Sequence, residues 1–186
     1  MYYMYFKELM KNLDEQAIIE TTDPKVFVGC ALGVFDDKFN FTELARGFNC
    51  NYSFNERLLG KTYRQIMFGS TDTKYRPWDK IIHAEENAVF NALSKCKKGH
   101  SLGYNTAVVT RYPCEKCAQL LIAKGIKWVI YGRSTPISEE TAMLFRQAGV
   151  QVIHIDYEVD EEKEAERLKS LKDKHLEFLF NNYKIS

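Results

Sequence analysis

Two short segments that lie far apart in the sequence contain the residues that most restrict how this chain folds. One reads HAE at residues 83–85, and the other reads PCEKC at residues 113–117. Imidazole nitrogen and thiolate sulfur are ligands that zinc prefers, and a catalytic zinc site keeps three protein ligands and one open position. We therefore expect a fold that brings His83, Cys114 and Cys117 together around one Zn²⁺ ion.

Glu85 lies two residues after the expected histidine ligand and is predicted to move protons without binding the metal. Zinc lowers the pKa of a bound water from about 15.7 towards about 7, so a nucleophile is available at neutral pH. A nearby carboxylate can take a proton from that water and pass protons to a ring nitrogen and then to a leaving amine. The pattern therefore indicates a zinc-dependent hydrolase with Glu85 as its catalytic residue.

Each part of this pattern also has a simpler interpretation. CxxC alone occurs as half of a structural zinc site or as a redox pair, and HxE is common on solvated helices. A structural site needs a fourth Cys or His at close spacing, which neither segment has. A redox pair leaves His83 and Glu85 unexplained. The two segments together therefore favour a catalytic zinc.

Composition favours a single soluble domain over residues 1–186. Of the 186 residues 45% are hydrophobic, and the formal net charge of +1 lacks the basic excess of a general nucleic-acid binder. No apolar run approaches the ~20 residues that span a bilayer, and the first residues do not resemble a signal peptide. Since cysteines expected on zinc suit a reducing compartment, the predicted location is the cytoplasm, without a membrane partner.

Hydrophobic periodicity predicts helices that alternate with strands, which is typical of a sheet with helices on its faces. Both metal-binding segments read as helix starts, because helix-compatible apolar spacing follows each of them and Pro113 suits a helix entry. The other predicted helices lie at about 6–19, 139–148 and 160–182, and the predicted strands lie at 26–35, 42–48, 106–110, 127–131 and 150–155.

The extra C-terminal helix at about 160–182 has an apolar face and a charged face. Its apolar face contains Leu168, Leu171, Leu176 and Phe180. Such a face packs on its own domain or serves as a partner-binding arm. Packing on the chain's own domain is the favoured interpretation.

The HAE and PCEKC segments, with several neighbouring tracts, resemble the cytidine and deoxycytidylate deaminase superfamily, and within it the deoxycytidylate (dCMP) deaminases. HxE combined with PCxxC is the signature of zinc nucleobase deaminases. HAEENA at 83–88 is similar to the family's HAExNA tract, and residues 72–75, 117–118, 124–127 and 144–150 also look like dCMP deaminase segments. The resemblance implies a three-layer α/β/α cytidine deaminase-like fold with a five-stranded mixed sheet. It also implies conversion of dCMP to dUMP with release of ammonia.

The resemblance further implies three substrate contacts. The backbone of Ala84 would contact the pyrimidine, and Asn49 would hold the sugar unless it is an ordinary loop asparagine. Tyr112 would lie beside the base, where its ring stacks on cytosine or packs under the metal loop. The resemblance also implies that the chain forms a homo-oligomer, a hexamer or a smaller assembly, and it suggests regulation by dCTP and dTTP, which some relatives show.

The chain departs from the family pattern in the expected sugar and phosphate region. Asn49 is followed by CNYSFN in place of the usual glycine and proline-containing turn. Residues 56–80 carry an excess of cations, which suits a nucleotide phosphate, although solvated surface explains the same charges. Arg111 is a further departure, with a phosphate or a neighbouring subunit as its candidate partner.

Some family members carry a second zinc, for which Cys30, Cys50, Cys96 and His100 are the spare ligands. Gly99 argues against one helix that joins Cys96 to His100, and Cys30 lies in an apolar strand, where a free cysteine behaves as a core residue. We therefore expect a single zinc.

Two other functions remain open at the level of sequence. One is a deaminase acting on cytidine, guanine, a riboflavin-pathway pyrimidine or tRNA adenosine; Asn87 in the HAEENA tract and the cationic stretch count against it. The other is a non-catalytic member that binds nucleotides or serves as an assembly partner. The intact Glu85 counts against that second function.

Overall fold

A five-stranded sheet forms the centre of the structure. The structure is a computed structural model, and it describes residues 2–21, 26–36, 38, 40–51, 81–95, 103–133 and 138–183. The strand order is β2-β1-β5-β6-β7, and β3 and β4 form a separate two-stranded sheet. The strands are β1 (Gly29–Phe35), β2 (Phe41–Phe48), β3 (Cys50–Asn51), β4 (Ile81–Ile82), β5 (Thr106–Arg111), β6 (Trp128–Arg133) and β7 (Gln151–His154). The helices are α1 (Tyr2–Glu20), α4 (Ala84–Lys95), α5 (Glu115–Ala123), α6 (Glu139–Gln147) and α7 (Glu161–Tyr183).

The sheet is mixed, as the resemblance implied. Strand β1 pairs antiparallel with β2 and β5, whereas β5, β6 and β7 run parallel. Parallel neighbours need crossover connections, which α5 and α6 provide. Strand β5 has buried residues from Thr106 to Thr110, as expected for a central strand covered on both faces.

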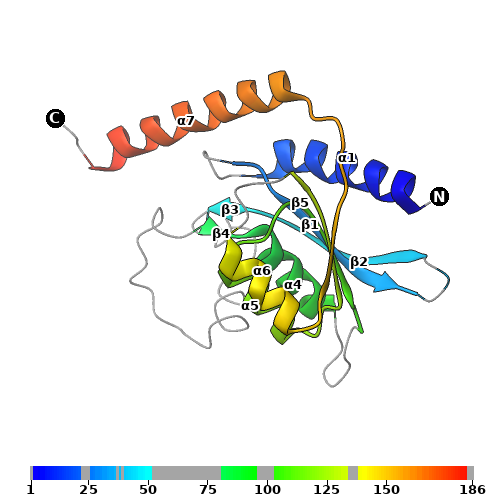
Figure 1. Cartoon of the computed structure of the whole chain (residues 1–186). Helices are drawn as coiled ribbons and strands as arrows, with labels where there is room; N and C mark the ends of the chain where they lie inside the picture. The colour runs from blue at the N-terminus through cyan, green and yellow to red at the C-terminus, as the bar shows by residue number, and fades with distance from the viewer. Residues whose placement is uncertain are drawn as a thin grey trace.

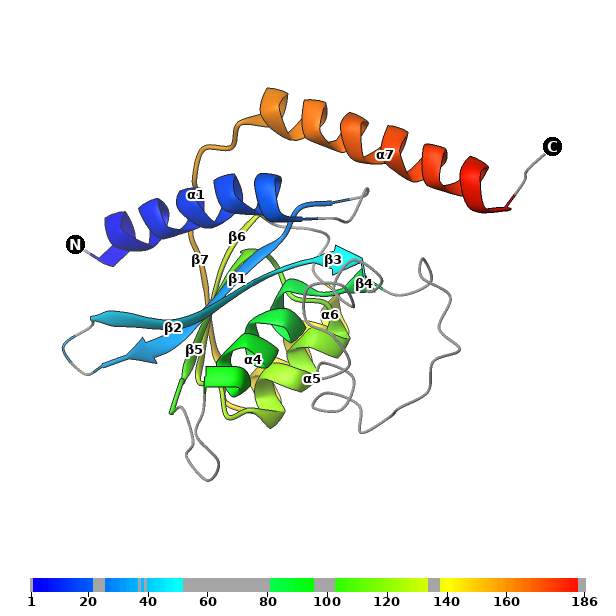
Figure 2. The same ribbon diagram turned by 180° about the vertical axis from the view of Figure 1, so that it is seen from behind.

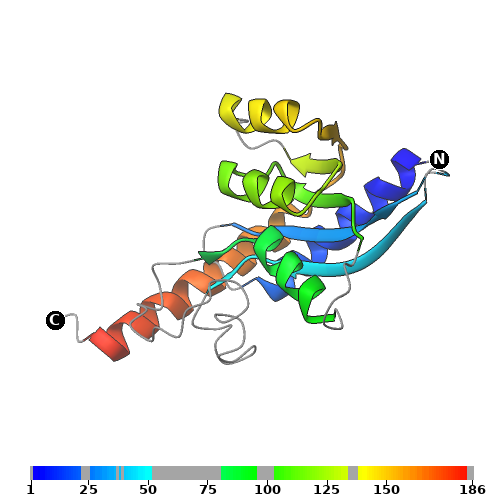
Figure 3. The same cartoon turned by 90° about the horizontal axis from the view of Figure 1, so that it is seen from below.

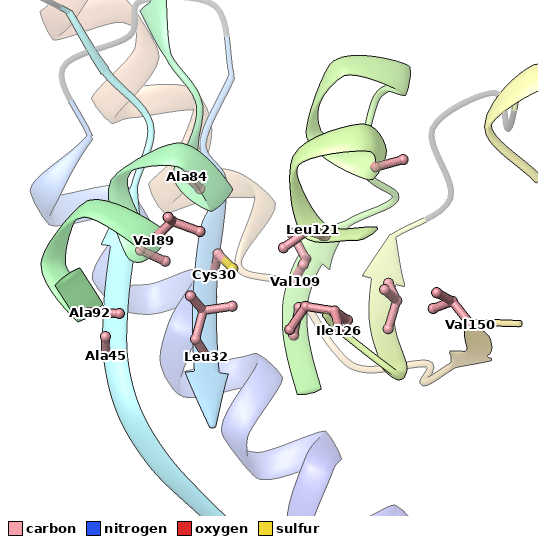
Figure 4. Packing of buried hydrophobic residues seen from close by; sticks show 14 of the residues in the cluster. Cys30, Leu32, Ala45, Ala84, Val89, Ala92, Val109, Leu121, Ile126 and Val150 are labelled. Carbon is pink, nitrogen blue, oxygen red and sulfur yellow. The ribbon is translucent and has the colours of Figure 1, made fainter. Parts of the chain in front are cut away.

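Helices cover both faces of the sheet (Figures 1 and 3). Successive strand residues point to opposite faces, so Cys30 and Leu32 pack with α4, α5 and α6, whereas Ala31 between them packs with α1. Figure 4 shows the first of these two cores, with Val89 of α4 and Leu121 of α5 over the sheet. The expected α/β/α layering is therefore confirmed.

Helix α7 lies over α1, on the side away from the sheet (Figure 2). Leu168 and Leu171 pack against a buried cluster of Ala17, Ile18 and Phe27. Arg167 donates hydrogen bonds to the carbonyl oxygens of Ile18 and Ile19, which lie in the last turn of α1. This part of α7 packs on its own chain, as expected, while the side chains of Leu176 and Phe180 lie outside the described residues.

The predicted elements agree with the structure to within a few residues at their ends. Helix α1 extends four residues further towards the N-terminus than predicted, and the predicted strand at 26–35 begins at Gly29. Gly125 and Gly149 end α5 and α6 with φ of 80° and 68°. The pairing of β3 with β4 was not predicted, because it joins two-residue strands that are distant in sequence. None of the helices in the described ranges contains an apolar stretch that could span a bilayer.

The absence of a side chain at Gly47 allows α4 to lie directly on β2. A Cβ atom at Gly47 would lie 2.1 Å from the Ala88 nitrogen and 2.5 Å from the Ala84 oxygen. Helix α4 presents small residues to the sheet, and Ala84, Ala88 and Ala92 are all fully buried. The first turn of α4 is thereby fixed against the strands.

A buried ion network joins α1, β5, β6 and α7. The Arg133 guanidinium donates to both carboxylate oxygens of Asp14, at 2.9 and 2.7 Å, and to Glu164 at 2.6 Å. Tyr157 donates to Asp14 at 3.1 Å, and Arg111 donates to the other oxygen of Glu164 at 3.2 Å. The network therefore links the carboxyl ends of β5 and β6 to α1 and α7.

Substituting Gly47 by alanine should destabilise the protein, because the new methyl group overlaps the backbone of α4. We expect the free energy of unfolding to fall by about 1–3 kcal/mol, the usual cost of overpacking. Urea unfolding followed by circular dichroism measures this change. Thr42→Ala, at an exposed position of the same strand, should cost less, and equal losses in the two variants would contradict the close approach.

Replacing Arg133 by methionine should destabilise the fold by about 3 kcal/mol near neutral pH, because Asp14 is left as a buried, unpaired charge. Burial raises the pKa of Asp14 above its unfolded value. The folded protein therefore binds a proton at Asp14 more readily than the unfolded protein does. As the pH falls through the raised pKa, Asp14 becomes neutral and part of the lost stability returns. The loss measured by urea unfolding should thus be smaller at about pH 5 than at about pH 7.

The matched control adds Asp14→Asn to the Arg133→Met variant. This second change removes the unpaired charge, so part of the lost stability should return at neutral pH. A loss that is the same at both pH values and unaffected by Asp14→Asn would show that the charge of Asp14 is not its cause.

Candidate metal centre

The three predicted zinc ligands lie at the starts of two neighbouring helices. His83 follows β4 and is the N-cap of α4, since the Asn87 N–H donates to the His83 carbonyl at 3.0 Å. Cys114 is the N-cap of α5, and Cys117 lies in the first turn of that helix. Strand β5 ends at Arg111, so the cysteine segment extends from the carboxyl end of the central strand.

The ligand atoms of these residues converge on one point. His83 Nδ1 lies 3.5 Å from Cys114 Sγ and 3.4 Å from Cys117 Sγ, and all three ligand atoms lie within 4.8 Å of one another. Tetrahedral bond lengths of about 2.0–2.1 Å to nitrogen and 2.3 Å to sulfur place N and S about 3.5 Å apart. The geometry fits zinc, with Nδ1 as the histidine ligand.

The cysteines are electrostatically suited to a cation. Hydrogen bonding with Cys117, followed by that with His83, lowers the pKa of Cys114 to about 3. The same bond to Cys114, together with burial, raises the pKa of Cys117. Because zinc binds thiolates, a divalent cation at this point would release the proton that Cys117 otherwise retains.

Glu85 lies beside the ligands in the first turn of α4 and is only 4% exposed. Burial raises the pKa of this carboxyl group to about 7, while the charge of His83 and a hydrogen bond with Cys117 act in the opposite direction. A carboxyl group with such a pKa can both accept and donate a proton near neutral pH. The predicted proton carrier therefore lies in a suitable environment.

Glu86 is a buried neighbour of the site that the sequence interpretation did not identify. One of its carboxylate oxygens accepts from the His83 backbone N–H at 3.0 Å, and the other accepts from Lys116 Nζ at 2.8 Å. A glutamate at the third helical position that bonds back to the N-cap N–H is half of a capping box. That spacing was visible in the sequence, but the contact with Lys116 was not.

Asn49 has its side chain occupied within the chain. Its Oδ1 accepts from the Val28 N–H at 2.7 Å and from the Thr21 hydroxyl at 3.0 Å, and its Nδ2 donates to the Val26 carbonyl at 2.7 Å. The residue is 3% exposed. This is the geometry of a loop asparagine, so the predicted sugar contact would require these bonds to be exchanged.

Tyr112 and Ala84 are both buried near the metal ligands. The Tyr112 ring packs edge-on against Tyr131 and Phe145, with centroids 4.8 and 6.2 Å away. These ring contacts are of the kind expected if Tyr112 packs under the metal loop, and stacking on a base stays a prediction. The Ala84 side chain is fully buried, but its N–H belongs to the first helical turn, where backbone donors have no partner within the helix.

The remaining candidates divide between core residues and residues outside the described part. Arg111 donates to Glu164 and to the Phe27 carbonyl of its own chain, at 3.2 Å in each case. Cys30 and Cys50 are buried cysteines, and among the described residues the only group of metal ligands is that of His83, Cys114 and Cys117. The cationic residues of 56–80, Cys96 and His100 lie outside the described ranges.

Comparison with known families gives a match over most of the chain. The model of the cytidine and deoxycytidylate deaminase zinc-binding region matches residues 4–133. Deoxycytidylate deaminase of Mus musculus is 40% identical over 92 residues, which are 47% of each chain. The riboflavin biosynthesis protein RibD of Actinobacillus pleuropneumoniae is 41% identical over 80 residues, 38% of this chain and 20% of that protein. The chain spans about half the length of the deoxycytidylate deaminases it matches.

A solved structure confirms the fold. The dCMP deaminase of the cyanophage S-TIM5, in complex with dCMP and dUMP, superposes with a TM-score of 0.51 at 20% sequence identity. The alignment covers 79% of this chain and 93% of the phage protein. The cytidine deaminase-like fold expected from the sequence is therefore confirmed.

Replacing Cys117 by alanine should abolish stable zinc binding, because two remaining protein ligands do not make the three-ligand site. We expect one Zn²⁺ per chain in the unmodified protein and close to none in this variant, measured by elemental analysis after dialysis. Cys30→Ala, which removes a buried thiol of the core, should retain one Zn²⁺. Loss of zinc from both variants would contradict the assigned ligand set.

Proposed function

Because the chain belongs to the cytidine and deoxycytidylate deaminase family, we propose that it catalyses hydrolytic deamination of dCMP to dUMP with release of ammonia. The observation that carries this proposal is the convergence of His83, Cys114 and Cys117 beside the buried carboxyl group of Glu85. The match to a deoxycytidylate deaminase covers 47% of that protein, against 20% of the riboflavin biosynthesis protein, which favours dCMP over other substrates of the family.

Zinc held by the three ligands would supply an activated water as the nucleophile for C4 of the cytosine ring. Glu85 would accept a proton from that water and deliver it to N3 of the ring. It would then take the second proton from the hydroxyl group now on C4 and pass it to the exocyclic amine, and the bond between C4 and the amine nitrogen would break as ammonia leaves. One water is consumed, and Glu85 returns to its initial protonation state.

Among the proposed substrate contacts, the backbone N–H of Ala84 has the strongest support, because it lies next to Glu85 at the helix start. Asn49 and Tyr112 already have partners within the chain, which supports roles in shaping the site. Phosphate recognition by the cationic stretch at 56–80 rests on sequence alone.

Several further properties rest on the family resemblance and composition. These are a single domain over 1–186, assembly into a homo-oligomer of hexameric or smaller size, regulation by dCTP and dTTP, and a cytoplasmic location. None of them is required for the proposed chemistry.

Replacing Glu85 by alanine should leave zinc bound and reduce turnover of dCMP by at least about 100-fold, because the proton carrier is lost. Ammonia release and chromatography of the product measure turnover, and elemental analysis measures zinc. Glu115→Gln, an exposed carboxylate of the cysteine segment, serves as the control and should retain activity. Retained activity in Glu85→Ala would overturn the role of Glu85.

The substrate is tested with the same assay by offering dCMP, CMP, deoxycytidine, cytidine, dCTP and guanine separately to the zinc-loaded protein. The match to a riboflavin biosynthesis protein makes a pyrimidine of that pathway a further member of the panel. Preference for dCMP supports the proposal. Activity only on unphosphorylated compounds would show that the nucleotide assignment is wrong, and no activity on any of them would favour a non-catalytic role.

A further inference from the structure

Glu86 and Lys116 form a direct contact between the two zinc-binding segments. Glu86 belongs to the first turn of α4 and Lys116 lies between the two cysteines in the first turn of α5. Their 2.8 Å ion pair joins a glutamate side chain that is 7% exposed to a lysine side chain that is 67% exposed. The contact connects the histidine segment to the cysteine segment at the level of the ligands.

The same carboxylate also holds the backbone of the histidine ligand. A helix N-cap residue normally uses its own side chain to satisfy free N–H groups, but the His83 ring faces the two sulfurs. Glu86 makes the reciprocal contact of a capping box, because its carboxylate accepts from the His83 N–H at 3.0 Å. Cys114, the N-cap of α5, likewise makes no side-chain cap bond. Both N-cap side chains thus face the metal point, while Glu86 satisfies a different donor, the N–H of the N-cap residue itself, and so ties the backbone of the histidine ligand to the first turn of α4.

We propose that Glu86 is a positioning residue that, through Lys116 and the His83 N–H, sets the separation of the histidine and cysteine ligands and thereby the affinity for zinc. Outer contacts of this kind orient metal ligands, and their loss typically weakens metal binding by about 10–100-fold. The inference rests on the zinc centre of the proposed function but not on the identity of the substrate.

Three variants separate the two contacts of Glu86. Lys116→Met removes the ion pair at an exposed position and leaves the bond to His83. Glu86→Gln keeps an acceptor for the His83 N–H but loses the charge, and Glu86→Ala loses both contacts. Glu115→Gln is the matched control, because Glu115 is an exposed carboxylate of the same segment. Its Oε1 accepts from Nε2 of Gln119, on the same helix, at 3.1 Å.

Zinc affinity is measured by competition with a chromophoric chelator, using Zn²⁺ alone and no substrate. We expect binding about 10-fold weaker in Lys116→Met and Glu86→Gln and weaker still in Glu86→Ala, with Glu115→Gln within twofold of the unmodified protein. The double variant Glu86→Gln/Lys116→Met should be no weaker than the singles, because both remove the same pair. Thermal unfolding of the zinc-free forms reports any change of fold stability separately.

Zinc affinity within twofold of the unmodified protein in both Lys116→Met and Glu86→Ala would overturn the proposal, even if the zinc-free forms unfold more easily. An equal loss in Glu115→Gln would also overturn it, because the effect would then be one of net charge. Failure of the unmodified protein to bind zinc would instead refute the proposed function, so the two failures are distinguishable.

Discussion

The contact between α4 and the sheet is the constraint on which the metal centre depends. Since Gly47 has no side chain and α4 presents alanines, the helix backbone lies against β2, and the orientation of its first turn is set by the strands. His83, Glu85 and Glu86 all lie at that first turn. A larger residue at the contact would move the histidine ligand and the proton carrier together, away from the cysteines on α5.

The metal centre is built from the N-terminal ends of α4 and α5, so the same few residues both begin a helix and bind the metal. Free backbone N–H groups and the helix dipole stabilise negative charge there, which suits two thiolates and a carboxylate. The cost is that His83 and Cys114 occupy the N-cap positions without capping their helices. In α4 the Glu86 carboxylate accepts from the N–H of His83 itself, which fixes the backbone of the histidine ligand at the helix start.

Sequence patterns predicted the residues of the metal centre and the main elements, because both depend on local spacing. HxE and CxxC at helix starts, and alternating apolar strands, are visible without knowledge of distant contacts. The partners of Asn49, Arg111 and Lys116 were not predictable in this way, since each is a side chain or backbone group far along the chain. For the same reason, the substrate contacts suggested for Asn49 and Tyr112 compete with internal packing that only the fold reveals.

The ion network around Arg133 connects the region matched by the family model to a helix that lies beyond it. The family match stops at residue 133, yet the guanidinium at that position binds Glu164, in the first turn of α7. The zinc-binding region as the family defines it therefore lacks one carboxylate that its own last residue uses. A shortened chain that ended before Glu164 would retain the ligands of the metal but would leave both Arg111 and Arg133 with an incomplete set of counter-charges.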